Sequence, residues 1–158
     1  MRNLIDALIR NRHRFRRTGI LGNLVGVLWA LPLSLLGLML ALPIRILHGR
    51  IDRVTGSVTA LLVRGPLADK LLERHPFGPM AAMAIGHIII ARQHGLTPQT
   101  LRHELAHVLQ AARWGPAFPL AYLVASAWAV LHGRQAYWHN HFEIAARKAE
   151  KHSRPTES

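Results

Sequence analysis

The sequence predicts an α+β fold preceded by a membrane segment. Three observations lead to this prediction: an uncharged stretch, a group of β-favouring segments, and two helical segments after them. At 158 residues the chain has room for one domain with a modest core. We divide it into a basic amphipathic arm (1–17), a membrane segment (18–46), one folded domain (47–151) and a disordered tail (152–158).

The composition restricts the kind of partner and the kind of site. Lys and Arg number 20 against 8 Asp and Glu, and the formal charge of +12 suits an anionic partner such as acidic lipid or nucleic acid. Nucleic acid is the weaker alternative, because no nucleic-acid motif is recognisable and the densest basic cluster adjoins the membrane segment. The chain has no cysteine, so any metal ion must be held by His, Asp or Glu.

The N-terminal region indicates contact with a membrane. Residues 1–17 combine arginines with apolar residues at helical spacing, as in an amphipathic arm, although a solvated basic tail is the alternative. Residues 18–44 carry no charge, and a helix of that length, at about 1.5 Å per residue, crosses a hydrocarbon core of about 30 Å. Pro32 allows a re-entrant hairpin instead, and a buried core helix would have to be apolar on every face.

The orientation of this segment stays open. Arginine is more frequent before residue 18 than just after residue 44, which favours a cytoplasmic N-terminus. A single span would then place the folded domain outside the cytoplasm, whereas a hairpin would leave it inside.

The middle of the chain is predicted to supply the β-structure. Residues 54–63 contain a Gly-Ser turn signal followed by a β-favouring run, and residues 66–74 suit a short helix. Residues 85–91 are rich in β-branched side chains, so we expect a single strand there. A helix should follow, with Thr97 as its N-cap and Gly115 at its end.

That helix contains a His-Glu-x-x-His motif. His103 and His107 are four residues apart, so both imidazoles project from one face and can bind one ion. Glu104 lies about 100° round the helix from His103, where its carboxylate can flank the ion and take a proton from a bound water. The alternative is a pair of surface histidines on an amphipathic helix.

A catalytic zinc site needs a third protein ligand and an open position. The best candidate is Glu143, early in a helix predicted for residues 140–151. Asn140 and Glu143 also fit a capping box, in which the glutamate only caps the helix. Three further histidines are weaker candidates for the ligand: His132, His139 and His141.

These features resemble the gluzincin branch of HExxH zinc metallopeptidases. The likeness is strongest to small bacterial membrane-associated HExxH proteins, through motifs at residues 103–110, 114–118 and 140–143, and it covers roughly residues 50–150. The resemblance implies a zincin-like domain with an edge strand, the HExxH helix and a second ligand helix. It also implies a location at the bacterial inner membrane.

The resemblance further implies the roles of single residues. One Zn²⁺ per chain would be held by His103, His107 and Glu143, with Glu104 as the general base. A peptide or protein substrate would pair with the edge strand that precedes the motif helix, which we assign to Gly86, His87, Ile88 and Ile89. Candidate stabilisers of the transition state are Tyr137, His139 and His141.

One position departs from the gluzincin pattern. Many gluzincins have an acidic residue four positions after the ligand glutamate, and it orients a ligand histidine, but here the residue is Arg147. The orienting partner must then come from Asp69, Glu150 or a backbone carbonyl.

Residues 114–133 contain no Lys, Arg, Asp or Glu, yet they should not cross the membrane. A crossing would put His107 and Glu143 on opposite sides, where they could not share an ion. We expect this segment to return as a hairpin, lie in the interface or cover the core. An intramembrane site is disfavoured, because Arg102 and Arg113 flank the motif.

The leading hypothesis is therefore a membrane-associated zinc-dependent metallopeptidase that hydrolyses peptide bonds with zinc-activated water. Its partners would be a peptide or protein substrate and a membrane with anionic lipid. The alternative is a catalytically inactive metal-binding or assembly protein with the same fold.

Overall fold

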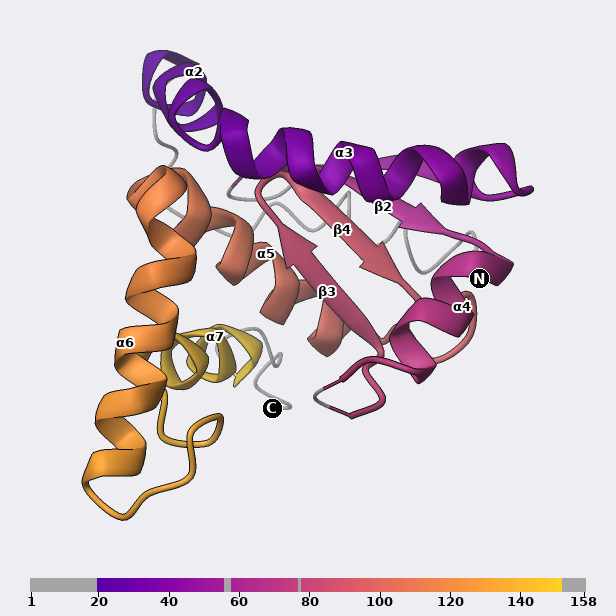
Figure 1. The fold of residues 1–158 in the computed structure, drawn as a ribbon. Coiled ribbons are helices and arrows are strands. Elements are labelled where there is room, and N and C mark those ends of the chain that lie inside the picture. The colour runs from indigo at the N-terminus through magenta and orange to yellow at the C-terminus, as the bar shows by residue number, and fades with distance from the viewer. Residues whose placement is uncertain (1–19, 56–57, 77, 152–158) are drawn as a thin grey trace, which may run out of the picture.

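The computed structural model describes residues 20–55, 58–76 and 78–151 and has a mixed α+β fold, as predicted (Figure 1). A four-stranded sheet has helices packed on both faces, and further helices lie beyond one of its edges. The predicted arm (1–17), the tail (152–158) and the turn at 56–57 lie outside the described residues.

The sheet is built from two hairpins. Its strands are β1 (Arg50–Thr55), β2 (Thr59–Arg64), β3 (Ala82–Ile85) and β4 (Ile88–Ala91), in the order β1-β2-β4-β3. The pairs β1/β2 and β3/β4 are antiparallel, whereas β2 and β4 are parallel. The predicted short helix is also present, as α4 (Pro66–Glu73), in the connection between β2 and β3.

The prediction of a single strand over residues 85–91 is wrong. Gly86 and His87 form a tight turn that separates β3 from β4, with Ile85 paired to Ile88. Gly86 has a φ of 59°, a conformation that favours glycine. A Cβ atom there would also lie 2.4 Å from the backbone nitrogen of Ser34. The turn is therefore determined by both backbone conformation and packing.

The uncharged N-terminal segment forms two helices, α2 (Ile20–Trp29) and α3 (Leu31–Ile46), which meet at Ala30 (Figure 1). Pro32 lies in the first turn of α3, so the segment divides into two helices just before this proline. The helix packs on the sheet through one stripe: Ser34, Gly37, Ala41 and Ile44. Its opposite face is exposed and apolar, so α3 is neither a fully buried core helix nor a helix free of the domain.

The two faces of the sheet form two cores. On one face α3 and α4 pack against Val63, Ile88 and Ile90. On the other face α5 (Pro98–Trp114) packs against Leu62 and Ile89, through Leu101 and Val108 among others. This division follows from the alternation of side chains along β2 and β4.

The motif helix has the predicted ends. The Thr97 hydroxyl accepts a hydrogen bond from the Thr100 amide at 3.1 Å, and Pro98 is the first residue of α5. Gly115, with φ 55° and ψ −136°, ends it and begins a short 3₁₀ helix, η1 (Gly115–Ala117).

Beyond η1 the chain leaves the sheet as α6 (Phe118–Leu131) and returns as α7 (His141–Lys151), which packs against α5 (Figure 1). Within the described residues, Pro98–Leu131 is the one stretch whose length and composition would suit a membrane span, and Leu31–Ile46 is a shorter apolar helix. The longer stretch comprises α5, η1 and α6 and changes direction at Gly115.

The contact between α3 and the sheet can be tested at Gly37. A Cβ atom there would lie 2.7 Å from the Ile85 carbonyl oxygen and 2.8 Å from the Ile88 Cβ. Gly37→Ala should therefore lower the free energy of unfolding by about 1–3 kcal/mol, because the helix must shift from the sheet. Leu38→Ala, at an exposed position of the same helix, should change it by less than about 0.5 kcal/mol.

Unfolding followed by circular dichroism compares the two variants with the parent. Equal stability of Gly37→Ala and the parent would contradict the packing of α3 on the sheet.

Candidate metal centre

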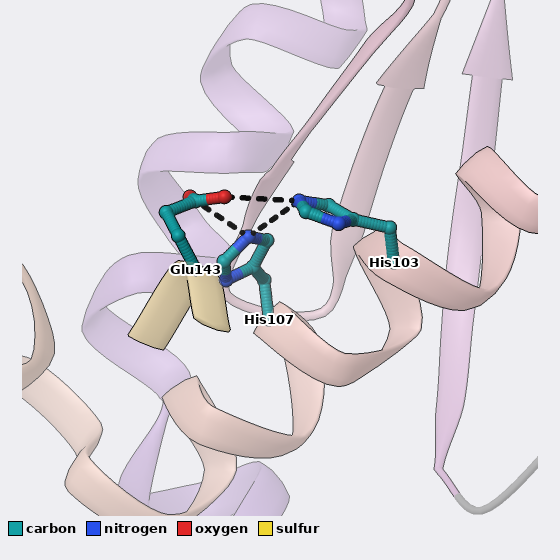
Figure 2. A group of neighbouring side chains, drawn as sticks. All are labelled: His103, His107 and Glu143. Carbon is teal, nitrogen blue, oxygen red and sulfur yellow. Dashed lines mark hydrogen bonds and ion pairs between the residues drawn. The ribbon is translucent and has the colours of Figure 1, made fainter. Parts of the chain in front are cut away.

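Two helices bring three potential ligands together. His103 and His107, one turn apart on α5, are buried and point toward α7 (Figure 2). Their Nε2 atoms lie 3.0 Å apart. Glu143, in the first turn of α7, is also buried, and its Oε2 lies 3.3 Å from Nε2 of His103. Its Oε1 lies 3.2 Å from Nε2 of His107.

Glu143 is not acting as a helix cap. The backbone amide of Asn140, which a capping-box glutamate would bind, donates to the Tyr137 carbonyl instead. Asn140 caps α7 alone, since its Oδ1 accepts from the Phe142 amide at 2.8 Å. The Asn140 side-chain amide also donates to the Tyr122 carbonyl and to Ser126, which ties the start of α7 to α6. The capping-box alternative is therefore wrong, and the Glu143 carboxylate faces the histidines.

The hydrogen bonds of the two Nδ1 atoms determine which nitrogen of each imidazole is free to bind an ion. Nδ1 of His103 lies 2.7 Å from a carboxylate oxygen of Glu150, and Nδ1 of His107 lies 2.8 Å from Oε1 of Gln110. The Gln110 amide nitrogen donates to the Phe142 carbonyl, so Oε1 is the atom left to accept from the ring. Both Nδ1 atoms therefore carry the proton in the neutral rings, and both Nε2 lone pairs point toward the other ring and Glu143.

This arrangement fits a metal ion. A tetrahedral zinc ion with bonds of about 2.0–2.1 Å separates its ligand atoms by about 3.3 Å, close to the three distances found here. Oε2 of Glu143 is buried without a hydrogen-bond partner. Without a cation, the two lone pairs and the carboxylate would repel one another. His103, His107 and Glu143 thus form a buried group that could hold a metal ion.

The pKa shifts have the same electrostatic cause. Burial opposes a charge on His103, but Glu143, Glu104 and Glu150 outweigh it and raise the pKa above the ordinary 6.5. Burial also opposes a charge on Glu143, yet the imidazoles of His103 and His107 hold its pKa well below the usual range. Glu143 is consequently ionised at neutral pH and attracts a cation to this point.

Glu104 is buried next to the ligand group. Its burial raises the pKa of the carboxyl group, against the opposing effect of His107 and His103. The carboxylate accepts a hydrogen bond from the backbone of Ala84 in β3. This bond links the motif helix to the sheet and holds the Glu104 side chain beside the two histidines.

Two tyrosines reach the ligand carboxylate. Tyr122, on α6, donates to Oε1 of Glu143 at 2.9 Å, and burial raises its pKa. Tyr137 also bonds to Glu143, and burial raises its pKa to about 12. Tyr137 is one of the expected stabilisers, whereas the sequence analysis missed Tyr122. An uncharged apolar segment carries no signal that one of its tyrosines faces a site 21 residues further along the chain.

The remaining candidate ligands lie elsewhere. His132, His139 and His141 are exposed, and in the described part of the chain none belongs to the group that could hold a metal. Asp69 accepts two hydrogen bonds from Gln93, so it does not orient a ligand histidine.

Of the expected orienting partners, Glu150 is the one that contacts a candidate ligand, His103. It lies one turn after Arg147 on α7. The acid absent at position 147 is therefore supplied three residues later on the same helix.

The expected edge strand needs correction. Gly86 and His87 lie in the turn, and Ile88 and Ile89 belong to β4, which is buried between β2 and β3. The free edge beside α5 is β3 (Ala82–Ile85), whose Ala84 contacts Glu104. Reading residues 85–91 as one strand placed the edge on the wrong residues, because the two-residue turn was not recognised.

No protein-family model, curated protein or solved structure matches this chain. Its function must therefore be argued from the geometry of the site.

The first prediction for this site concerns metal content. The purified chain should bind about one zinc ion, and His103→Ala and His107→Ala should each lose most of it. Protons compete for the same Nε2 atoms, and the pKa of His103 is raised. Zinc affinity should therefore begin to fall on acidification at a pH above 6.5.

Elemental analysis and competition with a chromophoric chelator measure both effects. His139→Ala is the matched control and should bind zinc like the parent. Loss of zinc from that control would contradict the ligand assignment.

A second prediction tests Glu150. Removing its carboxylate leaves Nδ1 of His103 without the acceptor that orients the ring. Glu150→Ala should weaken zinc binding by about 10–100-fold, as replacement of orienting partners usually does. Glu73→Ala removes an exposed acid from α4 and should have no effect. Equal zinc affinities of the two variants would show that Glu150 does not orient His103.

Proposed function

We propose that the protein is a membrane-associated zinc-dependent metallopeptidase with a gluzincin-like site. The observation that supports this most is the convergence of two Nε2 lone pairs and one buried carboxylate, with a second buried carboxylate beside them. Three ligands with an adjacent base are typical of catalytic rather than structural zinc. The resemblance of the His-Glu-x-x-His helix, and of the later helix that carries glutamate, to gluzincins supports the same class.

Peptide hydrolysis would use Glu104 as the general base. A zinc ion at this site would polarise a substrate carbonyl and lower the pKa of a water molecule. Glu104 takes a proton from the attacking water and delivers it to the amide nitrogen as the C–N bond breaks. The products are one carboxylate and one amine. The raised pKa of Glu104 suits this exchange, because a base works best when its pKa approaches the working pH.

The tyrosines fit supporting roles. Their raised pKa values keep both hydroxyl groups protonated at neutral pH, so they act as hydrogen-bond donors. Tyr122 orients Glu143. Tyr137, which is about half exposed, is the better placed of the two to turn toward a substrate oxyanion.

The position of β3 supports a site for an extended peptide. Its outer edge is not paired with another strand in the described structure, and Ala84 on that strand contacts the catalytic base. A peptide that added to this edge would pass beside Glu104.

A non-hydrolytic metal-binding or assembly protein is the second candidate. Arg147 favours it, because its guanidinium lies 3.8 Å from the ligand carboxylate and replaces the acid that many gluzincins have there. A cation beside Glu143 would weaken the negative charge that the metal experiences.

Substitution of the base separates the two candidates. Glu104→Gln should keep the zinc and lose hydrolysis, because Glu104 is not a ligand. Glu143→Gln should lose zinc affinity by about tenfold or more, with activity falling in parallel, because a neutral amide replaces a ligand carboxylate.

Both variants are compared with Glu73→Gln by zinc analysis and by mass spectrometry of a randomised peptide library. Equal hydrolysis by Glu104→Gln and the parent would exclude the proposed mechanism. Absence of hydrolysis in the zinc-loaded parent would favour the second candidate.

A further inference from the structure

Three helices of this protein present an apolar surface that nothing in the described structure covers. Most of the exposed large apolar side chains belong to α2, α3 and α6. The most exposed include Leu28 on α2, Met39 on α3 and Leu131 on α6, at 67%, 71% and 79%. Arg45 is the only charged residue in these three helices. Soluble proteins rarely expose an apolar surface of this extent.

The three helices meet at one corner of the molecule (Figure 1). Gly26 of α2 packs against Ala112 at the end of α5, and Trp29 packs on Gly115. From this corner α3 runs along the sheet and α6 runs away from it. The three helices therefore adjoin one another at this corner, and we call their exposed apolar side chains together the α2/α3/α6 surface.

We propose that the α2/α3/α6 surface inserts into one leaflet of an anionic lipid bilayer, so that the protein is monotopic and does not cross the membrane. The inference rests on the membrane association proposed above and specifies its geometry. The metal centre and the other helices would then all lie on one side of the membrane, because the chain enters and leaves the leaflet from that side.

The lengths and contacts of α3 and α6 argue against a span by either helix. At about 1.5 Å per residue, the 16 residues of α3 and the 14 of α6 reach about 24 and 21 Å, short of a core of about 30 Å. One face of α3 is occupied by the sheet, so lipid can reach only the other face. The segments before and after α6 contribute His107 and Glu143 to one site. The chain must therefore return, after α6, to the side of the membrane from which it came.

Charge favours lipid over a second copy of the chain. With a formal charge of +12, two copies repel each other, whereas anionic head groups attract each of them. Arg45 lies in the last turn of α3, Arg50 begins β1 shortly after that helix, and Arg134 follows α6, so cations border the apolar surface where head groups would lie. Trp29 and Trp128, both more than half exposed, suit the same interfacial depth.

The chain has no cysteine, so single-cysteine variants can report the depth of each helix. Met39→Cys and Leu123→Cys place a label on the exposed faces of α3 and α6. Gln99→Cys is the matched control, because it is exposed at the end of α5 that lies away from α6. Each full-length variant carries an environment-sensitive nitrobenzoxadiazole label. It is mixed with vesicles of phosphatidylcholine, with or without phosphatidylglycerol.

Monotopic insertion predicts a several-fold rise in emission for the labels at positions 39 and 123, only with phosphatidylglycerol, and none at 99. A spin label near the head group should quench the two labels more strongly than one at the end of the acyl chain. Stronger quenching by the chain-end spin label would indicate a span and would overturn the inference.

Two other results are distinguishable. Vesicle binding without any change at positions 39 and 123 would mean attachment through another part of the chain, which overturns the inference and leaves membrane association standing. Absence of vesicle binding, with a dimer in sedimentation, would assign the surface to a second copy and would reject membrane association as well. Neither readout depends on zinc or on hydrolysis.

Discussion

One electrostatic constraint explains the arrangement of the site. Two imidazole lone pairs and a carboxylate converge in a buried place, where they repel one another. Glu150 and Gln110 accept from the outer nitrogens of His103 and His107, so the inner nitrogens cannot donate to each other in the neutral rings. Glu143 adds a negative charge at 3.2–3.3 Å. A metal ion, or a proton on one of the imidazoles, makes this arrangement favourable, so these residues form a group that could hold a metal ion.

Each layer of the fold contributes to that support. The sheet holds α5 through its core and the proposed base Glu104 through Ala84, and α3 covers the opposite face of the same sheet. On the far side, α6 holds α7 by the hydrogen bonds of Asn140 and holds the ligand carboxylate by Tyr122. Because α6 also forms part of the apolar surface, one helix connects the proposed membrane contact to the metal centre.

Local patterns allowed much of the fold and site to be predicted. Helical spacing indicated that His103 and His107 share a face, and the capping residue Thr97 located the start of α5. Glu143 could be named but not separated from a helix cap, because both roles place glutamate early in a helix. Tyr122 could not be found, since its contact with Glu143 depends on how α6 turns back toward α7. The turn at Gly86 was missed because a β-branched run surrounds it.

The central claim is that His103, His107 and Glu143 are the protein ligands of one zinc ion. X-ray absorption at the zinc K-edge of the purified protein tests it most directly, because multiple scattering from imidazole rings shows how many histidines bind the ion. Our account predicts two imidazoles in a first shell of nitrogen and oxygen at about 2.0–2.1 Å, completed by carboxylate and solvent oxygen. A shell with three or more imidazoles would contradict it, because one of the exposed histidines would then have to replace Glu143.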